Sequence, residues 1–255
     1  RQLSAMPPDS YGVVNAASCR DLEVLVAALL EVEAEGQAFI FRTAASFVRV
    51  RAGIAPREAI APETLTADND HGGLFVVGSH VPQTTRQVNT LIESGKVKTV
   101  EIAVDALLDD ARCNSEIDRA VRAVDHGLKD GEDTVLFTSR KVVTAASDEA
   151  NLTIGQRVSD SLIRIVRGLT CQPRYLVAKG GITSSDVATK GLGVRRAMVL
   201  GQLLPGVPVW QLGDEARYPG MAYIVFPGNV GEDRALATLQ ERLSIDAQLT
   251  RYPKR

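Results

Sequence analysis

From about residue 73 onward, short apolar runs alternate with longer segments that carry the apolar spacing of amphipathic helices. The runs include GLFVVG, VKTVEIAV, TVLFTS and RYLVAKGG, and the segments between them include PQTTRQVNTLIESG, SEIDRAVRAVDHGLKDG and LTIGQRVSDSLIRIVRGL. Apolar residues at i, i+3, i+4 and i+7 predict helices, whereas short continuous apolar runs predict buried strands. Because such strands need cover on both faces, we expect an α/β fold with a largely parallel or mixed sheet flanked by helices.

The two ends of the chain complete this pattern. In the last third, VRRAMVLGQLLPGVPVWQLG and MAYIVFPGNVG predict short strands of a mixed sheet, and EDRALATLQERLSIDAQL predicts a closing helix. Near the start, we expect strands at residues 11–15 and 38–41 and helices in CRDLEVLVAALLEVEAEG and RTAASFVRVRAG. Residues 53–72 contain two prolines and show no clear period. We therefore expect the remnant of a second α/β domain at 1–55, a linker at 56–72 and a larger domain at 73–255.

Charge and cysteine content argue against several classes of protein. The net charge is −2, whereas nucleic-acid-binding proteins usually carry a basic patch. The three cysteines, Cys19, Cys113 and Cys171, are widely spaced and form neither a zinc pattern nor a disulfide framework. No apolar run approaches the roughly 20 residues that a membrane-spanning helix needs. We therefore expect a cytoplasmic protein that binds neither nucleic acid nor membrane.

Three predicted strands end in the same kind of turn, in which small residues are followed by polar residues. The turns are Gly78-Ser79-His80, the stretch from Gly180 to Ser184, and Pro227-Gly228-Asn229. Glycine lets backbone N–H groups approach a phosphate, although none of the turns completes a P-loop or a dinucleotide-binding pattern. In open α/β sheets, ligands bind outside the carboxyl ends of the strands. If the three strands are neighbours, the turns predict one ligand site.

Single residues beside these turns allow two interpretations each. Ser79 can donate its hydroxyl to a phosphate or cap the next helix, but it cannot pair with the adjacent His80 as a nucleophile and base. Lys179 can reach a phosphate or end its strand in solvent, and we expect solvent. Asp186 is expected in the first turn of its helix, where a carboxylate is favourable. Arg42, just after the run AFIF, can bind a carboxylate or phosphate, or hold the following helix through a salt bridge.

Taken in order, GLFVVGSHVPQTTRQVNTLI, YLVAKGGITSSDVATKGLGV and AYIVFPGNVG resemble the nucleotide-binding domain of the four-carbon acid sugar kinase family. YGVVNAASCRDLEVLVAALL and FIFRTAASFVRVRAGI resemble the closing portion of that family's first, sugar-binding domain. The motifs are short, but their order and spacing are jointly specific. The resemblance implies a kinase that uses ATP and Mg²⁺ to phosphorylate a four-carbon sugar acid of the 3-oxo-tetronate, threonate or erythronate type. It is also compatible with a homo-oligomer.

The same resemblance implies which residues bind the ligands. The ATP-binding residues carried over from the family are Ser79, Gly180, Gly181, Thr183, Ser184, Gly228 and Asn229. The first turn would contact the nucleotide or its phosphates, the second would wrap the phosphates, and the third would close over the nucleotide. Arg42 falls on the sugar-acid side and would bind the carboxylate of the substrate. The resemblance assigns neither a catalytic base nor a metal ligand in this chain.

One part of the family pattern is missing. The family's first domain begins with an aspartate-rich, glycine-containing motif that contributes to the substrate site, and nothing like DDxTG occurs here. We therefore expect part of the substrate site to lie outside these residues. The missing motif keeps open a non-catalytic nucleotide-binding module. An NAD-linked oxidoreductase is a further alternative, but no complete G-x-G-x-x-G follows a predicted strand.

Overall fold

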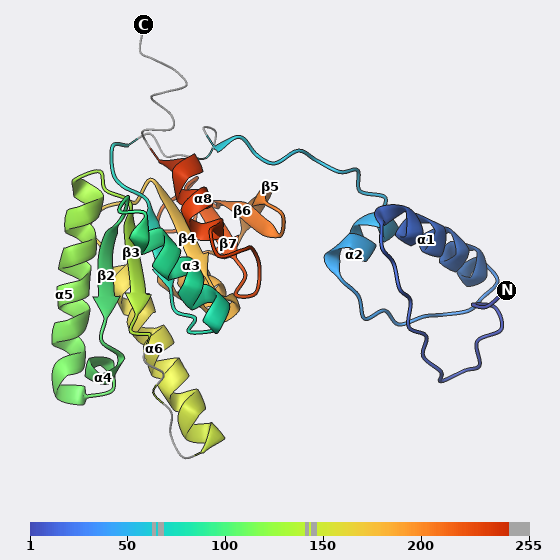
Figure 1. Cartoon of the computed structure of the whole chain (residues 1–255), viewed down its shortest axis with the longest axis horizontal. Helices are drawn as coiled ribbons and strands as arrows, with labels where there is room; N and C mark the ends of the chain where they lie inside the picture. The colour runs from blue at the N-terminus through green and yellow to red at the C-terminus, as the bar shows by residue number, and fades with distance from the viewer. Residues whose placement is uncertain (63–64, 66–68, 141–142, 144–146, 245–255) are drawn as a thin grey trace, which may run out of the picture. The chain divides into compact units, whose positions relative to one another are not determined.

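The chain forms two compact units, Arg1–Glu58 and Ala59–Arg255. The computed structural model describes residues 1–62, 65, 69–140, 143 and 147–244 (Figure 1). The segment directly after the boundary packs on the second unit, because the backbone N–H of Ile60 donates to Gln202 O at 2.9 Å and Leu65 is buried. Part of the expected linker at 56–72 is therefore in contact with the larger unit.

The first unit contains two helices that the sequence predicts, α1 (Cys19–Ala34) and α2 (Ala45–Arg51). Ser18 caps α1 by accepting a hydrogen bond from the backbone N–H of Asp21, whose carboxylate accepts from the N–H of Ser18. This reciprocal capping satisfies two backbone donors that the helix leaves free. The small core of the unit consists of buried apolar residues from both helices: Val26, Leu29, Val32 and Phe47.

The strands expected at residues 11–15 and 38–41 are wrong, because both segments are outside any strand. The side chains of Tyr11 and Val13 are 93% and 85% exposed, so the apolar residues that suggested a strand are not covered. An apolar run becomes a strand only when a neighbouring chain completes its hydrogen-bond ladder. In its described residues, the first unit therefore has helices but no strand of an α/β domain.

The second unit is built on a mixed seven-stranded sheet with the order β2-β3-β1-β4-β7-β6-β5. The strands β2, β3, β1, β4 and β7 are parallel, and β6 and β5 join antiparallel. The strand bounds are β1 Leu74–Val77, β2 Lys98–Ile102, β3 Thr134–Thr138, β4 Tyr175–Lys179, β5 Ala197–Leu204, β6 Val207–Leu212 and β7 Ala222–Phe226. The predicted α/β class with a mixed sheet is confirmed.

Helices cover both faces of this sheet (Figure 1). The bounds are α3 Pro82–Glu93, α4 Val104–Leu107, α5 Asp110–Lys129, α6 Asp148–Gly168, α7 Gly181–Asp186, the π-helical turn η2 Val187–Gly191 and α8 Ala235–Leu243. Residues of α5, α6 and η2 form one core with the sheet, and residues of α3 and α8 form the other. Successive residues of β1, β3 and β4 are buried on opposite faces, which explains their continuous apolar runs.

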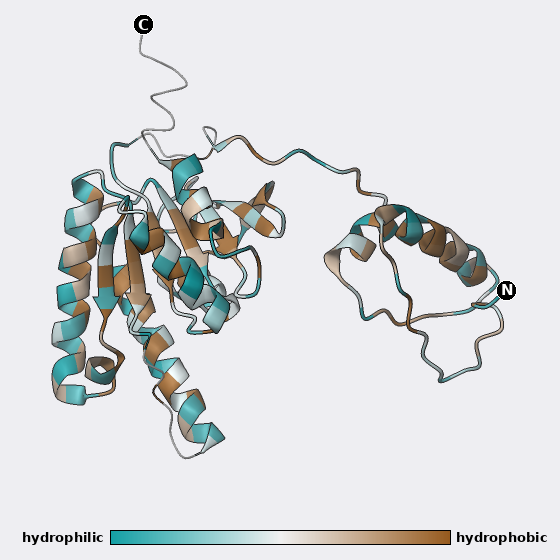
Figure 2. Cartoon of the chain, viewed as in Figure 1, coloured by the Kyte–Doolittle hydropathy of each residue, from teal (hydrophilic) through white to brown (hydrophobic). Residues whose placement is uncertain are grey.

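The distribution of hydropathy agrees with this layered arrangement. Figure 2 shows hydrophobic residues in the strands and many hydrophilic residues along the outer helix α5. Within the ranges that the structure describes, no helix combines the length and the apolar character required to span a membrane.

Candidate functional site

The three glycine turns predicted from the sequence lie at one edge of the sheet. They follow β1, β4 and β7, which are consecutive neighbours, with Val77 paired to Lys179 and Lys179 paired to Phe226. The backbone N–H of Gly180 also donates to Phe226 O at 2.9 Å, which ties the second turn to the end of β7. The condition that the strands be neighbours is therefore met, and the turns meet where α/β proteins bind ligands.

Two of these glycines are required by the geometry of the turns. Gly180 has a φ of +117°, which a residue with a Cβ rarely adopts, and an added Cβ would lie 3.2 Å from the Cβ of Ser79. A Cβ on Gly78 would lie 2.5 Å from Oγ1 of Thr183, a contact that forces a shift. A Cβ on Gly228 would lie 4.0 Å from both the Cα of Gly180 and Oγ of Ser79. The turns are thus packed against one another.

Backbone N–H groups remain free at this edge. Among the described residues, the N–H groups of Gly181, Ile182 and Thr183 have no hydrogen-bond acceptor, and neither do those of Gly228 and Asn229. A Cβ built on Gly181 would meet no atom within 4 Å, so the space beside this residue is open. Unpaired N–H groups gathered around open space form an environment that suits an anion such as phosphate.

Lys179, the last residue of β4, binds backbone carbonyl groups of the turn after β7. Its Nζ donates to Pro227 O at 2.7 Å, Gly228 O at 3.3 Å and Val230 O at 3.4 Å, and it lies 4.1 Å from the centre of the Phe226 ring. The side chain is fully buried. The expectation that Lys179 ends its strand in solvent is wrong, because β4 is a central strand and the turn after β7 closes over its end.

The environment of Lys179 is unusual for a lysine. In the described part of the chain, no carboxylate lies within ion-pair distance of its Nζ. Burial lowers the pKa of Lys179 from 10.5 to about 8, because removal from water disfavours the charged form. Lys179 is therefore a buried amine held by carbonyl oxygens rather than by an opposite charge.

Side chains of helix α3 bind the same loop. Nε2 of Gln87, a buried side chain, lies 3.0 Å from the carbonyl oxygens of Val230, Gly231 and Glu232. Thr84, one turn earlier in α3, donates its hydroxyl to Gly228 O at 3.3 Å. These contacts, together with those of Lys179, bind most of the carbonyl groups of the loop, whereas its N–H groups at Gly228 and Asn229 have no acceptor among the described residues.

Thr183 and Ser184 differ in what their side chains reach. Oγ of Ser184 is buried and lies 2.7 Å from both Ala178 O and Gly180 O, so its hydroxyl links the end of β4 to the start of α7. Thr183 is also buried, and its side chain packs against Gly78 and Gly180. Both residues position the turn, and their contacts with ATP stay a prediction.

The predicted position of Asp186 is wrong. Helix α7 begins at Gly181 and ends at Asp186, so this carboxylate is not in the first turn. The Ser159 hydroxyl donates to it at 2.7 Å, and Lys190 forms an ion pair with it at 3.0 Å. These contacts, the hydrogen bond from Ser159 first, lower the pKa of Asp186. The residue joins α7 and η2 to α6.

The turn after β1 is held by an arginine that the sequence reasoning missed. Arg140, two residues after β3, donates to Ser79 O at 2.8 Å and to the Thr138 hydroxyl at 2.7 Å. Burial lowers the pKa of Arg140. Ser79 does not cap α3, because α3 begins at Pro82 after Val81 and has no side-chain cap. A cation directly after the run TVLFTS was the available signal for Arg140.

Arg42 is the predicted substrate-binding residue outside the second unit. It is exposed and lies between Phe41 and α2 in the first unit. Its alternative role in holding the following helix is not seen, because no ion pair of Arg42 occurs among the described residues. Its contact with a sugar acid stays a prediction.

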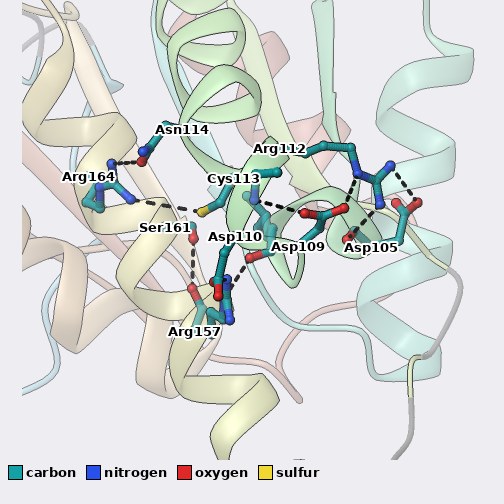
Figure 3. Close-up of polar contacts among 11 residues, drawn as sticks. Asp105, Asp109, Asp110, Arg112, Cys113, Asn114, Arg157, Ser161 and Arg164 are labelled. Atoms are coloured by element: carbon teal, nitrogen blue, oxygen red, sulfur yellow. Dashed lines mark hydrogen bonds and ion pairs between the residues drawn. The ribbon is translucent and has the colours of Figure 1, made fainter.

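A second polar region lies between α5 and α6 (Figure 3). It is a groove of about 440 Å³ whose lining residues all belong to these two helices. Arg157 pairs with Asp110, and Arg164 donates to Oδ1 of Asn114 at 2.8 Å (Figure 3). Because its arginines already have partners within the groove, this region is a weaker ligand site than the edge with unpaired N–H groups.

No site for a protein-bound metal emerges from the described ranges, in which no three His, Cys, Asp or Glu side chains come together. Mg²⁺ in nucleotide sites is commonly held by phosphate oxygens, water and only one or two protein ligands.

Comparisons with known proteins identify the family of the larger unit. Residues 74–236 match the model of a family described as a nucleotide-binding C-terminal domain. A search of curated proteins finds no match. A solved structure from Salmonella typhimurium LT2, named as a tRNA synthase, superposes with a TM-score of 0.62 at 17% identity, over 90% of this chain and 52% of that one.

A second solved structure has a related fold. It is a domain of unknown function from Bordetella bronchiseptica, a domain-swapped dimer with bound citrate, with a TM-score of 0.54 at 20% identity over 91% of this chain and 52% of that one. The chain thus spans about half the length of the solved structures that it matches. The family match includes all three turns, from β1 to the loop after β7. The chain therefore belongs to the nucleotide-binding C-terminal domains of the four-carbon acid sugar kinase family.

Proposed function

We propose that this chain binds ATP at the edge formed by the turns after β1, β4 and β7, and that it acts in transfer of the terminal phosphoryl group to a hydroxyl of a four-carbon sugar acid. The single observation that carries the proposal is the meeting of three glycine turns with unpaired N–H groups. Phosphoryl transfer depends mainly on positioning and on neutralising phosphate charge, which such donors provide.

In our proposal, some residues of the three turns bind the phosphates and others position the turns. The N–H groups of Gly181, Ile182, Gly228 and Asn229 donate to phosphate oxygens in our proposal, and the Ser79 hydroxyl lies beside them. Mg²⁺ bound to the phosphates would neutralise charge during transfer. In our proposal Ser184 and Lys179 position the turns without contacting the phosphates, because their polar atoms bind backbone carbonyls.

The acid substrate requires a cation for its carboxylate, and Arg42 is our candidate in this chain. The Bordetella bronchiseptica relative holds citrate, a carboxylate ligand, which supports small acids as ligands of this fold. That relative is a domain-swapped dimer, which supports a homodimer here. Which four-carbon acid accepts the phosphoryl group is to be decided by an assay with 3-oxo-tetronate, threonate and erythronate.

Replacing Gly181 with leucine tests the ATP site. The added side chain meets no protein atom at its Cβ, and Gly181 does not have a positive φ, so the fold should tolerate it. The leucine would occupy the open space beside the unpaired N–H groups. We expect wild-type protein to bind ATP–Mg in calorimetric titration and Gly181→Leu to lose that binding.

The matched control is Gly155→Leu in α6, where an added Cβ also meets no atom within 4 Å. This variant should bind ATP–Mg as the wild type does. If the wild type shows neither heat nor a thermal shift at millimolar ATP, the proposed ATP site is wrong. If Gly181→Leu binds as tightly as Gly155→Leu, the nucleotide lies elsewhere.

A kinase assay separates catalysis from binding alone. Since the chain spans about half of the structures that it matches, binding without turnover of any of the three acids would favour a nucleotide-binding module. Formation of a phosphorylated acid together with ADP would support the full proposal. Nicotinamide binding in place of ATP binding would instead favour an oxidoreductase.

A further inference from the structure

We propose that Lys179 is the positioning residue of the phosphate site: its buried ammonium group holds the loop after β7 so that the N–H groups of Gly228 and Asn229 face the bound phosphates, and the phosphates in turn balance its charge. This inference rests on the proposed ATP site and assigns to that site a residue that does not touch the nucleotide. Lys179 acts through the peptide groups between them.

The first argument is the planarity of the peptide group. In the described ranges no peptide bond is cis, and in a trans peptide the C=O and the next N–H point in opposite directions. Lys179 binds the carbonyl oxygens of Pro227 and Gly228. The N–H groups of Gly228 and Asn229 are therefore directed away from Lys179.

The second argument is that several side chains bind the carbonyl groups of this loop. Thr84 donates to Gly228 O as well, and Gln87 reaches Val230 O, which is also within 3.4 Å of Lys179 Nζ. Because the carbonyls of Pro227, Gly228 and Val230 are bound, the loop cannot rotate these peptides without breaking several hydrogen bonds. The N–H groups are thus oriented before a ligand arrives, which lowers the entropic cost of binding.

The third argument is the missing counter-charge. The charged groups on the elements packed on this side are Arg86 and Glu93 of α3, Glu232, Asp233 and Arg234 of the loop, and Glu241 and Arg242 of α8. Within the described part of the chain, none of them is in ion-pair distance of Lys179, and Arg86 instead pairs with Asp233 at 2.9 Å. Phosphate across the loop supplies the opposite charge that this cation lacks.

A consequence is that ATP binding and protonation of Lys179 favour each other. Burial lowers the pKa of Lys179 to about 8, so at pH 8 about half of the free protein carries the proton. A nearby opposite charge raises the pKa of an amine. Binding at pH 8 should then take up a fraction of a proton per ATP, and a smaller fraction at pH 7.

Isothermal titration of ATP–Mg at pH 7 and pH 8, in buffers of different ionisation enthalpy, measures this uptake. The phosphates of ATP contribute little to the measured proton uptake at pH 8, since the second pKa of a phosphate is about 6. Titration of Lys179→Met separates the proton uptake of Lys179 from that of every other titratable group.

The variants are Lys179→Met, which removes the charge, and Lys179→Arg, which keeps it. Lys190→Met is the control, because Lys190 is an exposed lysine of η2 paired with Asp186. We expect Lys179→Met to weaken ATP–Mg binding at pH 7 by about tenfold or more and to abolish proton uptake at pH 8. Lys179→Arg should recover part of the affinity, and Lys190→Met should bind and take up protons as the wild type does.

The outcomes separate this inference from the proposed function. If the wild type does not bind ATP–Mg, the ATP site itself is wrong and the role of Lys179 falls with it. If the wild type binds but takes up no proton between pH 7 and pH 8, the coupling through Lys179 is wrong, even where Lys179→Met fails to fold. Equal affinity of a folded Lys179→Met would also overturn the inference.

Discussion

At the scale of single residues, the site separates groups that face the ligand space from groups that face the protein. The space beside Gly181 is open, since an added Cβ would meet no atom within 4 Å. The side chains of the nearby residues Ser184 and Lys179 instead bind backbone carbonyls. Polar residues in a glycine-rich turn are therefore not equivalent. Those with buried side chains determine the shape of the turn, and the backbone N–H groups are what the turn presents.

Ser184→Ala tests this distinction. Its hydroxyl joins the end of β4 to the start of α7, so its loss should lower the free energy of unfolding by about 1 kcal/mol. Ser185→Ala is the control, because Ser185 is exposed in the same helix. Urea unfolding of both variants measures the effect. Unchanged stability with weakened ATP binding in Ser184→Ala would instead place this hydroxyl on the nucleotide.

At the scale of elements, the site depends on which strands are neighbours and on what α3 holds. The strands β1, β4 and β7 are separated by many residues in the chain but are adjacent in the sheet. Helix α3 follows β1, yet its Thr84 and Gln87 bind the loop after β7. One helix thereby couples the first turn to the third, and it does so through side chains buried in the core.

Gln87→Met measures the importance of that coupling. The change keeps the size of the side chain but removes the donor to the carbonyls of Val230, Gly231 and Glu232. Loss of these part-buried hydrogen bonds should lower the free energy of unfolding by about 1 kcal/mol, and ATP affinity should fall with it. Urea unfolding and calorimetry provide both numbers.

The control for this change is Asn89→Met, at an exposed position of the same helix. It should leave stability and ATP binding near those of the wild type. A Gln87→Met protein that matches Asn89→Met in both measurements would show that α3 does not hold the loop.

At the scale of the whole molecule, the two units have separate cores. The core of the first unit comes from α1 and α2, and the two cores of the second unit surround its sheet. All ATP-binding residues that we propose belong to the second unit, whereas Arg42 belongs to the first. Nucleotide binding and acid binding are thus assigned to different units.

A chain that begins at Ala59 tests this division. Because the second unit contains its own sheet and cores, the shortened chain should keep the thermal transition of that unit and the ATP–Mg affinity of the full chain. Differential scanning calorimetry and titration of both proteins make the comparison. Loss of folding or of ATP binding in the shortened chain would show that residues 1–58 are required for the nucleotide site.

Much of the second unit could be predicted from the sequence, because its patterns are local. The alternation of apolar runs with helical spacing placed β1, β3, β4 and the helices between them, and glycine after a strand marked each turn. The same signal failed in the first unit, where residues 11–15 and 38–41 are apolar but lie outside any strand. A strand is a property of a pair of segments, and a run of apolar residues describes only one of them.

The sequence by itself determined the α/β class, the turns and the residue types that the turns carry. Only the tertiary structure decided that the three turns meet, that Lys179 is buried, that Asp186 ends α7 and that Arg140 holds the first turn. The physical reason is that propensity and periodicity act over a few neighbouring residues. Burial, hydrogen-bond partners and pKa depend on segments that the fold brings together from distant parts of the chain.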